Sequence, residues 1–516
     1  FNFGGAYTFA GGLAPDLDAA GEPLRDASGQ LVMSNITSIE RYRRTLLFQR
    51  AGLTAAEIRE RGGGATQFSI TGGDPAAYGR QLDFGAFVQD EWRVRQHFSL
   101  SLGLRYESQT NISNGLNLAP RISFAWAPFA RRDTKEPVIV IRGGFGIFYD
   151  RFNENIVVTA SRYNGITQRQ FVLSDAAVLD LFPAVPSFES VAANSSFPPL
   201  VRRIGSALRV PYLMQSALSL ERQLPMKTTV TLTYINSRTR RAFNSRNVNA
   251  PLPGTVDPNL PGSGVRPDVS AGNILQFESG GRIHQNQLLV AVNNRLSSNL
   301  SFFINYSLSK TMSDTEGLGS FPANSYDMSD EYSRASSDIR HTFTFGGNFA
   351  TRFGIRLNPL VIATSGRPFN IITGRDANGD TLFTDRPAFA MDLTKPGVIV
   401  TRFGAFDPNP EAGQEIIPRN FGEGPSFFVV NLNVSRTFSF GRAVSGAQAG
   451  ASASAVRAEK RYGLTLTLRV QNLFNRTNGG VPVGNIRSAL FGLSVMSAGS
   501  FGFGGVNPSV GNRRLE

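Results

Sequence analysis

The densest group of residues that could bind a ligand is a short acidic segment in the C-terminal half of the chain. Asp376, Asn378 and Asp380 stand at alternate positions, and Asp385 follows five residues later. Three oxygen-bearing side chains at this spacing are typical of the start of a calcium-binding loop. These four residues therefore predict a structural calcium site, although the Gly and Glu that would complete an EF-hand are replaced by Thr and Pro.

The same segment is also typical of a turn at a loop tip. Asn-Gly and Asp are common turn formers, because their side chains hydrogen-bond to the backbone two residues on. The incomplete ligand spacing favours this interpretation over the calcium site. Beyond that calcium, the sequence indicates no cofactor. A second group of acidic residues could bind a cation or a basic ligand, but is also consistent with ordinary loop charge: Asp314, Glu316, Asp327, Asp330, Glu331 and Asp338.

Known catalytic motifs are missing from the sequence. It contains no Cys, and its only His residues are His97, His284 and His341. This inventory excludes Cys nucleophiles and Cys-ligated metals, and it leaves little for a His-based triad. No nucleophile elbow, His-Glu-x-x-His motif or phosphate-binding loop occurs. We therefore expect that the protein is not an enzyme.

The elements that must position these residues are strands, because apolar and polar residues alternate over long stretches. From Phe98 to Tyr106, apolar side chains occupy every second position, and Ser, Gly or Arg fill the positions between. Residues 462–470 repeat the pattern. Such a segment has one apolar and one polar face. Its length suits a tilted strand of about 9–11 residues that crosses a bilayer better than a soluble strand of about 5–6.

The connections between these segments support a membrane barrel. We expect strands at about 80–94, 98–108, 118–129, 138–149, 208–220, 228–236, 283–296, 299–310, 339–350, 354–373, 427–438 and 461–474. Short turns alternate mostly with long loops, at about 10–79, 150–207, 237–282, 311–338 and 374–426. Outer-membrane barrels show this asymmetry, whereas long irregular loops count against a compact soluble sandwich. With 1–9 as an entering strand and a truncated strand from about 512, the prediction is an all-β, transmembrane antiparallel β-barrel of about 14 strands.

Three Arg residues alternate with the apolar residues of these strands and would face the lumen. Arg105, Arg142 and Arg469 would place positive charge inside the barrel, where it could favour anionic solutes. The alternative is that each Arg pairs with a facing carboxylate or with a plug domain.

Several short motifs are similar to those of TonB-dependent receptors. They match best the Oar-like group of these receptors, which has a carboxypeptidase-regulatory-like domain. They are FVQDEWRV at 87–94, LGLRYE at 102–107, APR at 119–121, RGGFGIFYD at 142–150, DIRH at 338–341, SGRPF at 365–369 and VQNLFN at 470–475. The resemblance implies a total of 22 strands in the complete barrel, with an N-terminal plug energised by the TonB complex. It places the protein in the Gram-negative outer membrane, with its ligand bound outside the cell.

On this resemblance, residues 1–516 are expected to form a single β-barrel segment that lacks the plug and N-terminal domains. TonB would then act through a plug that is not present in this chain. The predicted function is energy-coupled uptake of an unidentified ligand that the extracellular loops recognise. The alternatives are an outer-membrane structural or adhesion protein that binds a partner through its loops, and a passive porin.

The net charge of +13 comes from 52 Lys and Arg against 39 Asp and Glu. These cations are spread along the chain, whereas a nucleic-acid-binding protein usually shows a basic stripe or a recognisable module. We therefore expect no nucleic-acid partner. Another hypothesis is that the cations partly balance acidic lipid headgroups at the cell surface, which requires some Arg residues on the outer rim of the barrel.

Overall fold

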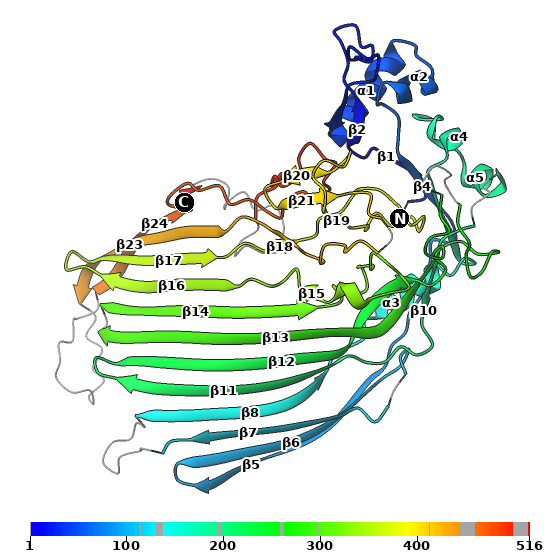
Figure 1. Ribbon diagram of the computed structural model, residues 1–516. Coiled ribbons are helices and arrows are strands. Elements are labelled where there is room, and N and C mark those ends of the chain that lie inside the picture. The colour runs from blue at the N-terminus through cyan, green and yellow to red at the C-terminus, as the bar shows by residue number, and fades with distance from the viewer. Residues whose placement is uncertain are drawn as a thin grey trace.

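The computed structural model describes residues 2–113, 115–128, 138–194, 198–257, 263–297, 299–411, 413–443, 460–498 and 514–515. Most of its strand residues belong to one large, curved sheet (Figure 1). Its successive strands are β5 (Asp83–Arg95), β6 (Phe98–Gln109), β7 (Leu118–Trp126), β8 (Ile139–Tyr149), β11 (Tyr212–Leu224), β12 (Thr228–Asn247), β13 (Ile274–Ser297), β14 (Leu300–Ser313), β16 (His341–Ala350), β17 (Ile355–Thr364), β23 (Phe427–Ala443), β24 (Lys460–Gln471) and β25 (Arg514–Leu515). β10 (Val201–Ile204) and β15 (Ser333–Arg334) pair with β13 and β14 and complete the 15-stranded sheet.

Each strand along this path pairs with its neighbours in antiparallel fashion, and the order in the sheet is the order in the sequence. Every segment predicted as a strand between 80 and 474 forms one of these strands, so the all-β antiparallel sheet is confirmed. Within the described residues, β5 and β25 are its two edges. Among the same residues, no helix is both long and apolar enough to cross a membrane.

The predicted entering strand at 1–9 is wrong. β1 (Ala6–Thr8) pairs with β4 (Gln67–Gly73), and β4 pairs with β9 (Gln168–Leu173), in a separate three-stranded sheet. Tyr7 explains the difference, because its ring packs on that of Phe68, with the ring centroids 4.6 Å apart. The apolar side chain thus finds a protein core rather than lipid. The predicted tail strand is found as β25, while residues 512, 513 and 516 lie outside the described residues.

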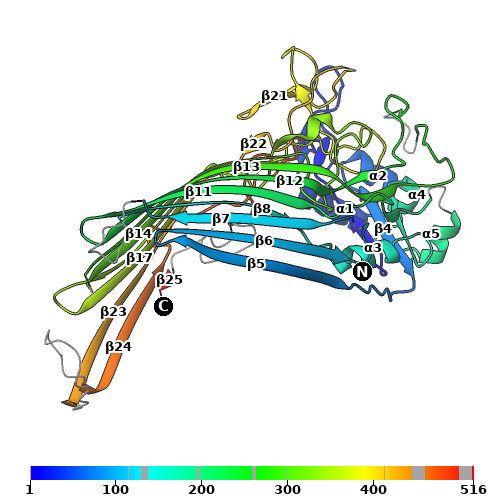
Figure 2. The same ribbon diagram turned by 90° about the horizontal axis from the view of Figure 1, so that it is seen from below.

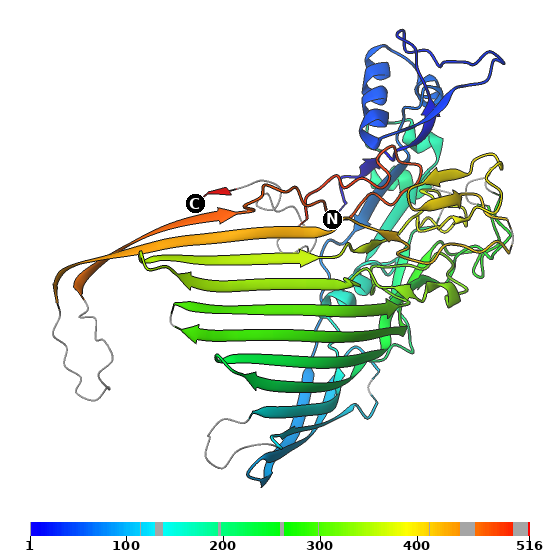
Figure 3. The ribbon, with the colours of Figure 1, turned by 60° about the vertical axis from the view of Figure 1, so that its left-hand side comes forward.

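The helices and small sheets lie at one end of the long strands (Figures 1 and 3). The helices are α1 (Ser38–Arg50), α2 (Ala55–Glu60), α3 (Glu154–Arg162), α4 (Ala176–Leu179), α5 (Phe188–Asn194) and the 3-10 turn η1 (Ser329–Glu331). The remaining short strands are β2 (Gly12–Pro15), β3 (Met33–Ile36), β18 (Pro368–Phe369), β19 (Ala388–Phe389), β20 (Ile399–Thr401), β21 (Gly404–Asp407) and β22 (Gly422–Glu423). This end, which we call the loop end, is also where the long connections leave the sheet.

The segment expected as a loop at 10–79 contains local structure that its sequence explains. Thr37 caps α1, because its hydroxyl accepts the N–H of Glu40 at 3.0 Å. Thr54 and Glu57 form a reciprocal capping box at the start of α2. These caps satisfy backbone donors that would otherwise be unpaired at the helix ends. The segment is therefore a folded unit rather than an irregular loop.

Most buried apolar side chains lie at the loop end rather than on the long strands. One cluster surrounds Phe68 and Phe171 under the β1–β4–β9 sheet, and another surrounds Ile371 and Phe406 under the short strands β18 to β22. On the long strands, by contrast, apolar side chains are exposed, as Leu218 is at 56% and Leu232 at 43%. A soluble sheet would bury these residues, whereas a membrane barrel turns them toward lipid.

The opposite face of the long strands is polar. The hydroxyls of Ser219 and Thr233 lie 2.9 Å apart across β11 and β12, and the side-chain amide of Gln287 donates to Ser307 at 2.9 Å. Such cross-strand hydrogen bonds satisfy polar groups on a wet surface. Figure 2 shows the sheet from below, with its long curve from β5 to the hairpin of β23 and β24. The sheet therefore has a lipid-facing side and a lumen side.

Substitution of neighbouring residues on β12 tests this assignment. Leu232→Arg places a charge in lipid and should lower the free energy of unfolding by about 2–4 kcal/mol. Thr231→Arg, on the lumen side of the same strand, should change it by less than about 1 kcal/mol. The measurement is reversible urea unfolding in phospholipid bilayers. Equal losses for the two variants would contradict the assignment of the faces.

Candidate functional site

Two long connections at the loop end are joined by buried ion pairs. Glu331, from the 311–338 connection, lies 2.8 Å from Arg386, and the two side chains are only 4% and 2% exposed. Arg419 reaches the same Glu331 at 3.8 Å and also contacts Glu316 at 3.3 Å. Because a buried charge is costly unless it is paired, this network requires that the two connections lie together.

A second acidic side chain of the 311–338 connection fixes the end of a strand. Asp338 is fully buried, and its carboxylate accepts the backbone N–H of Thr311 at 2.7 Å. Its other oxygen lies 2.9 Å from Arg334 and 3.4 Å from Arg340. Glu331 and Asp338, two members of the predicted acidic group, thus have internal partners that hold the connection in place.

The predicted calcium ligands fold their oxygens back onto their own loop. The two carboxylate oxygens of Asp376 accept the N–H groups of Asp380 and Thr381, at 2.9 and 2.8 Å. Asn378 accepts the N–H of Asp380 at 3.1 Å. Asp385 accepts the N–H of Ala377 at 2.8 Å and so closes the segment. These are the side-chain-to-backbone hydrogen bonds of an Asx-type turn.

This acidic loop, residues 376–385, docks on two other connections. Asn273 donates to the carbonyl oxygen of Asp380 at 2.8 Å and to the hydroxyl of Thr381 at 2.6 Å. Arg266 donates to the carbonyl oxygen of Gly379 at 3.0 Å. Asn378 donates in turn to the carbonyl oxygen of Ala323 at 3.0 Å. The acidic loop therefore joins the connections at 248–273 and 311–338.

The carboxyl groups of the acidic loop lie close to one another and away from water. Burial raises the pKa of Asp380 to about 7 and that of Asp385 to about 7, and the negative charge of Asp376 adds to both effects. The pKa of Asp376 is also raised, chiefly by burial. Oδ2 of Asp380 is buried and has no hydrogen-bond partner among the described residues.

These carboxyl groups do not converge on one point as metal ligands do. Within the part of the chain that the structure describes, no three acidic or His side chains gather closely enough to hold a metal ion. The hydrogen bonds are those of the turn interpretation, and the calcium site at Asp376, Asn378, Asp380 and Asp385 stays a prediction.

The three Arg residues predicted to face the lumen have different surroundings. Arg142 contacts Glu221 of the neighbouring β11 at 2.7 Å, and Arg105 contacts Glu107 of its own strand at 2.5 Å. Arg469 lies opposite Asn433 of β23. The first two Arg residues are therefore paired with carboxylates, as the alternative interpretation expects, and their role in anion selectivity stays a prediction.

Sequence reasoning missed the partners that hold the loop end together. Arg386, Arg419 and Asn273 belong to no local motif, and their partners are far away in the sequence. The one available signal concerned Arg386, because an Arg that stands beside Asp385 and Pro387 in a long connection is a candidate for a buried ion pair. This signal does not identify the residue with which the Arg pairs, however.

Removal of the shared carboxylate tests the buried network. Glu331→Gln leaves the buried Arg386 without its counter-charge and leaves Arg419 with Glu316 alone, and it should cost about 3–5 kcal/mol of local stability. Glu22→Gln, which removes a carboxylate 60% exposed beside Arg61, is the control and should cost about 0–1 kcal/mol. Hydrogen exchange of the backbone in 311–338 and 374–386 measures the difference. Similar exchange rates in both variants would contradict the network's role.

The raised pKa values predict a pH dependence of the acidic loop. Folded Asp380 and Asp385 hold protons up to about pH 7, whereas an open loop releases them near pH 4. The folded loop therefore binds more protons, and its stability falls as pH rises from about 4 to 7. With a chelator present, hydrogen exchange at 376–385, after correction for its intrinsic pH dependence, should accelerate at least about tenfold over this range.

Asp380→Asn should flatten this pH profile, because the amide keeps the acceptor oxygen but does not ionise. An unchanged profile in this variant, or a flat profile in the unmodified protein, would contradict the assignment. Addition of Ca²⁺ at pH 8 separates the two interpretations of the loop. Restored protection would support a calcium site, and unchanged exchange would support a turn held by its own backbone.

Comparison with solved structures finds outer-membrane receptors and transporters. The transporter YddB of Escherichia coli is 12% identical, with a TM-score of 0.45, and the match covers 77% of this chain and 42% of that one. A mutant ferric enterobactin receptor PfeA of Pseudomonas aeruginosa is 12% identical, with a TM-score of 0.44 and coverages of 87% and 49%. The siderophore receptor PirA of the same organism is 12% identical, with a TM-score of 0.37 and coverages of 80% and 49%. The chain thus spans about half or less of the length of these structures.

No curated protein matches this sequence. A family model does match, and its description is outer membrane beta barrel domain. The match covers residues 61–117 and 111–502, which include every long strand from β5 to β24. The exposed apolar face of these strands and their short turns opposite long loops are what such a barrel requires. The chain therefore belongs to the outer membrane beta barrel domain family and lies in the outer membrane of a Gram-negative bacterium.

Proposed function

We propose that this chain is the C-terminal barrel part of a TonB-dependent transporter and that its loop end recognises the ligand. The observation that carries the proposal is the organised loop end. Buried ion pairs and hydrogen bonds hold the connections at 248–273, 311–338 and 374–426 against one another. A rigid group of loops above a polar lumen suits selective capture better than free diffusion, since preorganised loops lose less entropy on binding.

The motif resemblance supports the energy-coupled part of the proposal. The first two motifs form one hairpin, in which Trp92 of β5 lies opposite Leu100 of β6. In the last motif, Asn472 donates its N–H to the side chain of Asn431 at 2.9 Å and ends β24. The motifs therefore lie within strands of the barrel itself or at the ends of those strands. In this proposal, the barrel has no catalytic step, and TonB acts through a plug outside residues 1–516.

The alternatives differ from the proposal in what they require of the full-length protein. A passive porin conducts solutes through an open lumen and needs no energy coupling. A structural or adhesion protein binds a partner through its loops and contacts no TonB. Both can have the sheet and the loop end described above, so that a test must address energy coupling directly.

Binding of TonB by the full-length natural protein provides that test without knowledge of the ligand. The purified periplasmic domain of TonB from the same organism should bind the detergent-solubilised protein and should not bind a general porin from the same membrane. In planar bilayers, the full-length protein should stay closed, because a plug fills its lumen. Steady conductance without TonB binding would show a passive porin, and a closed barrel that does not bind TonB would show a structural or adhesion role.

A further inference from the structure

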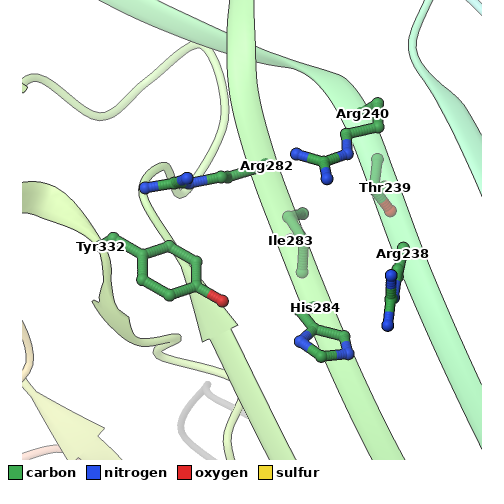
Figure 4. Close-up of a pocket in the computed structure, with 7 residues that line it drawn as sticks. All are labelled: Arg238, Thr239, Arg240, Arg282, Ile283, His284 and Tyr332. Atoms are coloured by element: carbon green, nitrogen blue, oxygen red, sulfur yellow. The ribbon is translucent and has the colours of Figure 1, made fainter.

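Five basic side chains gather where β12, β13 and β14 leave the apolar band toward the loop end. We call Arg238, Arg240, Arg282, His284 and Lys310 the outer-rim cluster. Four of them line a pocket of about 320 Å³ together with Tyr332 (Figure 4). Arg238, Arg240 and Lys310 are close enough to interact electrostatically with the His284 ring. The four Arg and Lys residues of the cluster therefore concentrate positive charge on one small surface.

The register of the strands places this cluster on the lipid-facing side of the sheet. Leu232 and Tyr234 of β12 are exposed on that side, and the next residues on the same face are Asn236, Arg238 and Arg240, because successive side chains alternate between faces. Across the sheet, Arg238 lies opposite His284 and Arg240 opposite Arg282. In β14, Lys310 lies opposite Asn286 of β13, which is two residues nearer to the apolar band than His284. The cluster thus lies on the lipid-facing side of the sheet, next to the apolar band and nearer to the loop end.

Tyrosine residues mark the boundary between the apolar band and the cluster. The hydroxyl of Tyr234 donates to Asn286 at 2.8 Å, and the hydroxyl of Tyr306 lies 2.8 Å from Nδ1 of His341. Tyr is enriched at the level of lipid headgroups, because its ring is apolar and its hydroxyl is polar. Arg238 follows Tyr234 by four residues, or roughly 13 Å along a tilted strand. Its long side chain can therefore reach the headgroup layer.

The charges of the cluster are largely uncompensated. Arg282 lies 3.3 Å from Asp314, and its guanidinium stacks on the ring of Tyr332 at 4.5 Å from the centroid. Arg238 and Arg240 are both exposed and have no carboxylate partner within the described ranges of the chain. Elsewhere at the loop end, Arg residues such as Arg386 and Arg419 are paired internally. The outer-rim cluster therefore has charge available for an external anion.

We propose that the outer-rim cluster binds a phosphate group of the glycolipid that forms the outer leaflet. Guanidinium groups hold phosphate through paired, charge-assisted hydrogen bonds, and Arg238 and Arg240 can supply them. The acyl chains of the same lipid would lie on Leu232, Leu288 and Leu308 directly below. This combination of cations and an adjoining apolar band fits a lipid, whereas a soluble anion would use the cations alone. The inference rests on the outward orientation of the loop end in the proposed function.

The experiment measures lipid retention by the full-length protein in nanodiscs. One set contains phosphatidylcholine with bis-phosphorylated lipid A, and the other contains phosphatidylcholine with dephosphorylated lipid A. Native mass spectrometry after detergent exchange counts the retained glycolipid. The unmodified protein should retain the phosphorylated form, and Arg238→Gln with Arg240→Gln should lower its apparent affinity about 30-fold, since each Arg near the surface contributes a factor of about five.

Two further variants keep this test informative. Arg222→Gln removes an exposed Arg from the same lipid-facing side, but at the short-turn end of β11, and should leave retention unchanged. Arg238→Lys with Arg240→Lys keeps the charge and should retain at least part of the binding. Circular dichroism and resistance to SDS at room temperature establish that each variant is folded.

Several outcomes would overturn the proposal. These are equal retention of the two lipid A forms, undiminished retention in the double Gln variant, or equal losses in the Arg222→Gln control. Displacement of the lipid by millimolar inorganic phosphate would show a general anion site instead. None of these outcomes depends on TonB, so that failure of the lipid site and failure of the transport proposal can be told apart.

Discussion

The lack of hydrogen-bonding partners in the bilayer is the constraint on which the rest of this structure depends. Every N–H and C=O group of a membrane-spanning segment must be paired within the protein, because hydrocarbon offers no substitute. The long antiparallel strands from β6 to β23, each of which has a long strand on both sides, meet this requirement through their neighbours in sequence order. The alternation of apolar and polar residues then follows, because one face of each strand meets lipid and the other meets the lumen.

The loop end obeys a different balance of forces. Outside the bilayer, water competes for every polar group, so that chain segments stay together only if they bury apolar surface or pair their charges. This protein does both, with the apolar cluster around Phe68 and the ion pairs of Glu331 with Arg386 and Arg419. Buried ion pairs add little net stability compared with apolar packing, but an unpaired member is very costly. The network therefore selects one arrangement of the loops.

The sequence alone was sufficient to predict the long strands, because the alternation of apolar and polar residues with a period of two is a local signal. Residues 98–106 could be assigned without knowledge of any partner. The segment at 1–9 shows the limit of this signal, because its short apolar pattern suits lipid and a protein core equally well, and the contact of Tyr7 with Phe68 decides between them. Local chemistry also predicted a turn at Asp376 to Asp380, where each hydrogen bond spans five residues or fewer.

The organisation of the loop end could not be predicted in the same way. Glu331 and Arg386 are 55 residues apart in the sequence, and Asn273 and Asp380 are 107 apart. No spacing rule connects such residues, because only the pairing of the strands between them brings them together. The outer-rim cluster has the same origin, since the pairing of Arg238 with His284 depends on the register of two strands. The charges were visible in the sequence, but their common location was a result of the register.

Two adjacent residues connect the membrane-facing surface with the loop network. The side chain of Glu331 points to the buried Arg386, whereas the ring of Tyr332 lies against Arg282 of the outer-rim cluster. Glu331 ends the 3-10 turn η1 and Tyr332 follows it in extended backbone, so that this one short segment contacts both groups. If Arg238 and Arg240 hold a lipid phosphate as proposed, it would lie beside Arg282, which is opposite Arg240, and would limit the motion of Tyr332. The position of the buried carboxylate of Glu331, and of the two connections that it joins, would then depend on the surrounding lipid as well as on contacts within the protein.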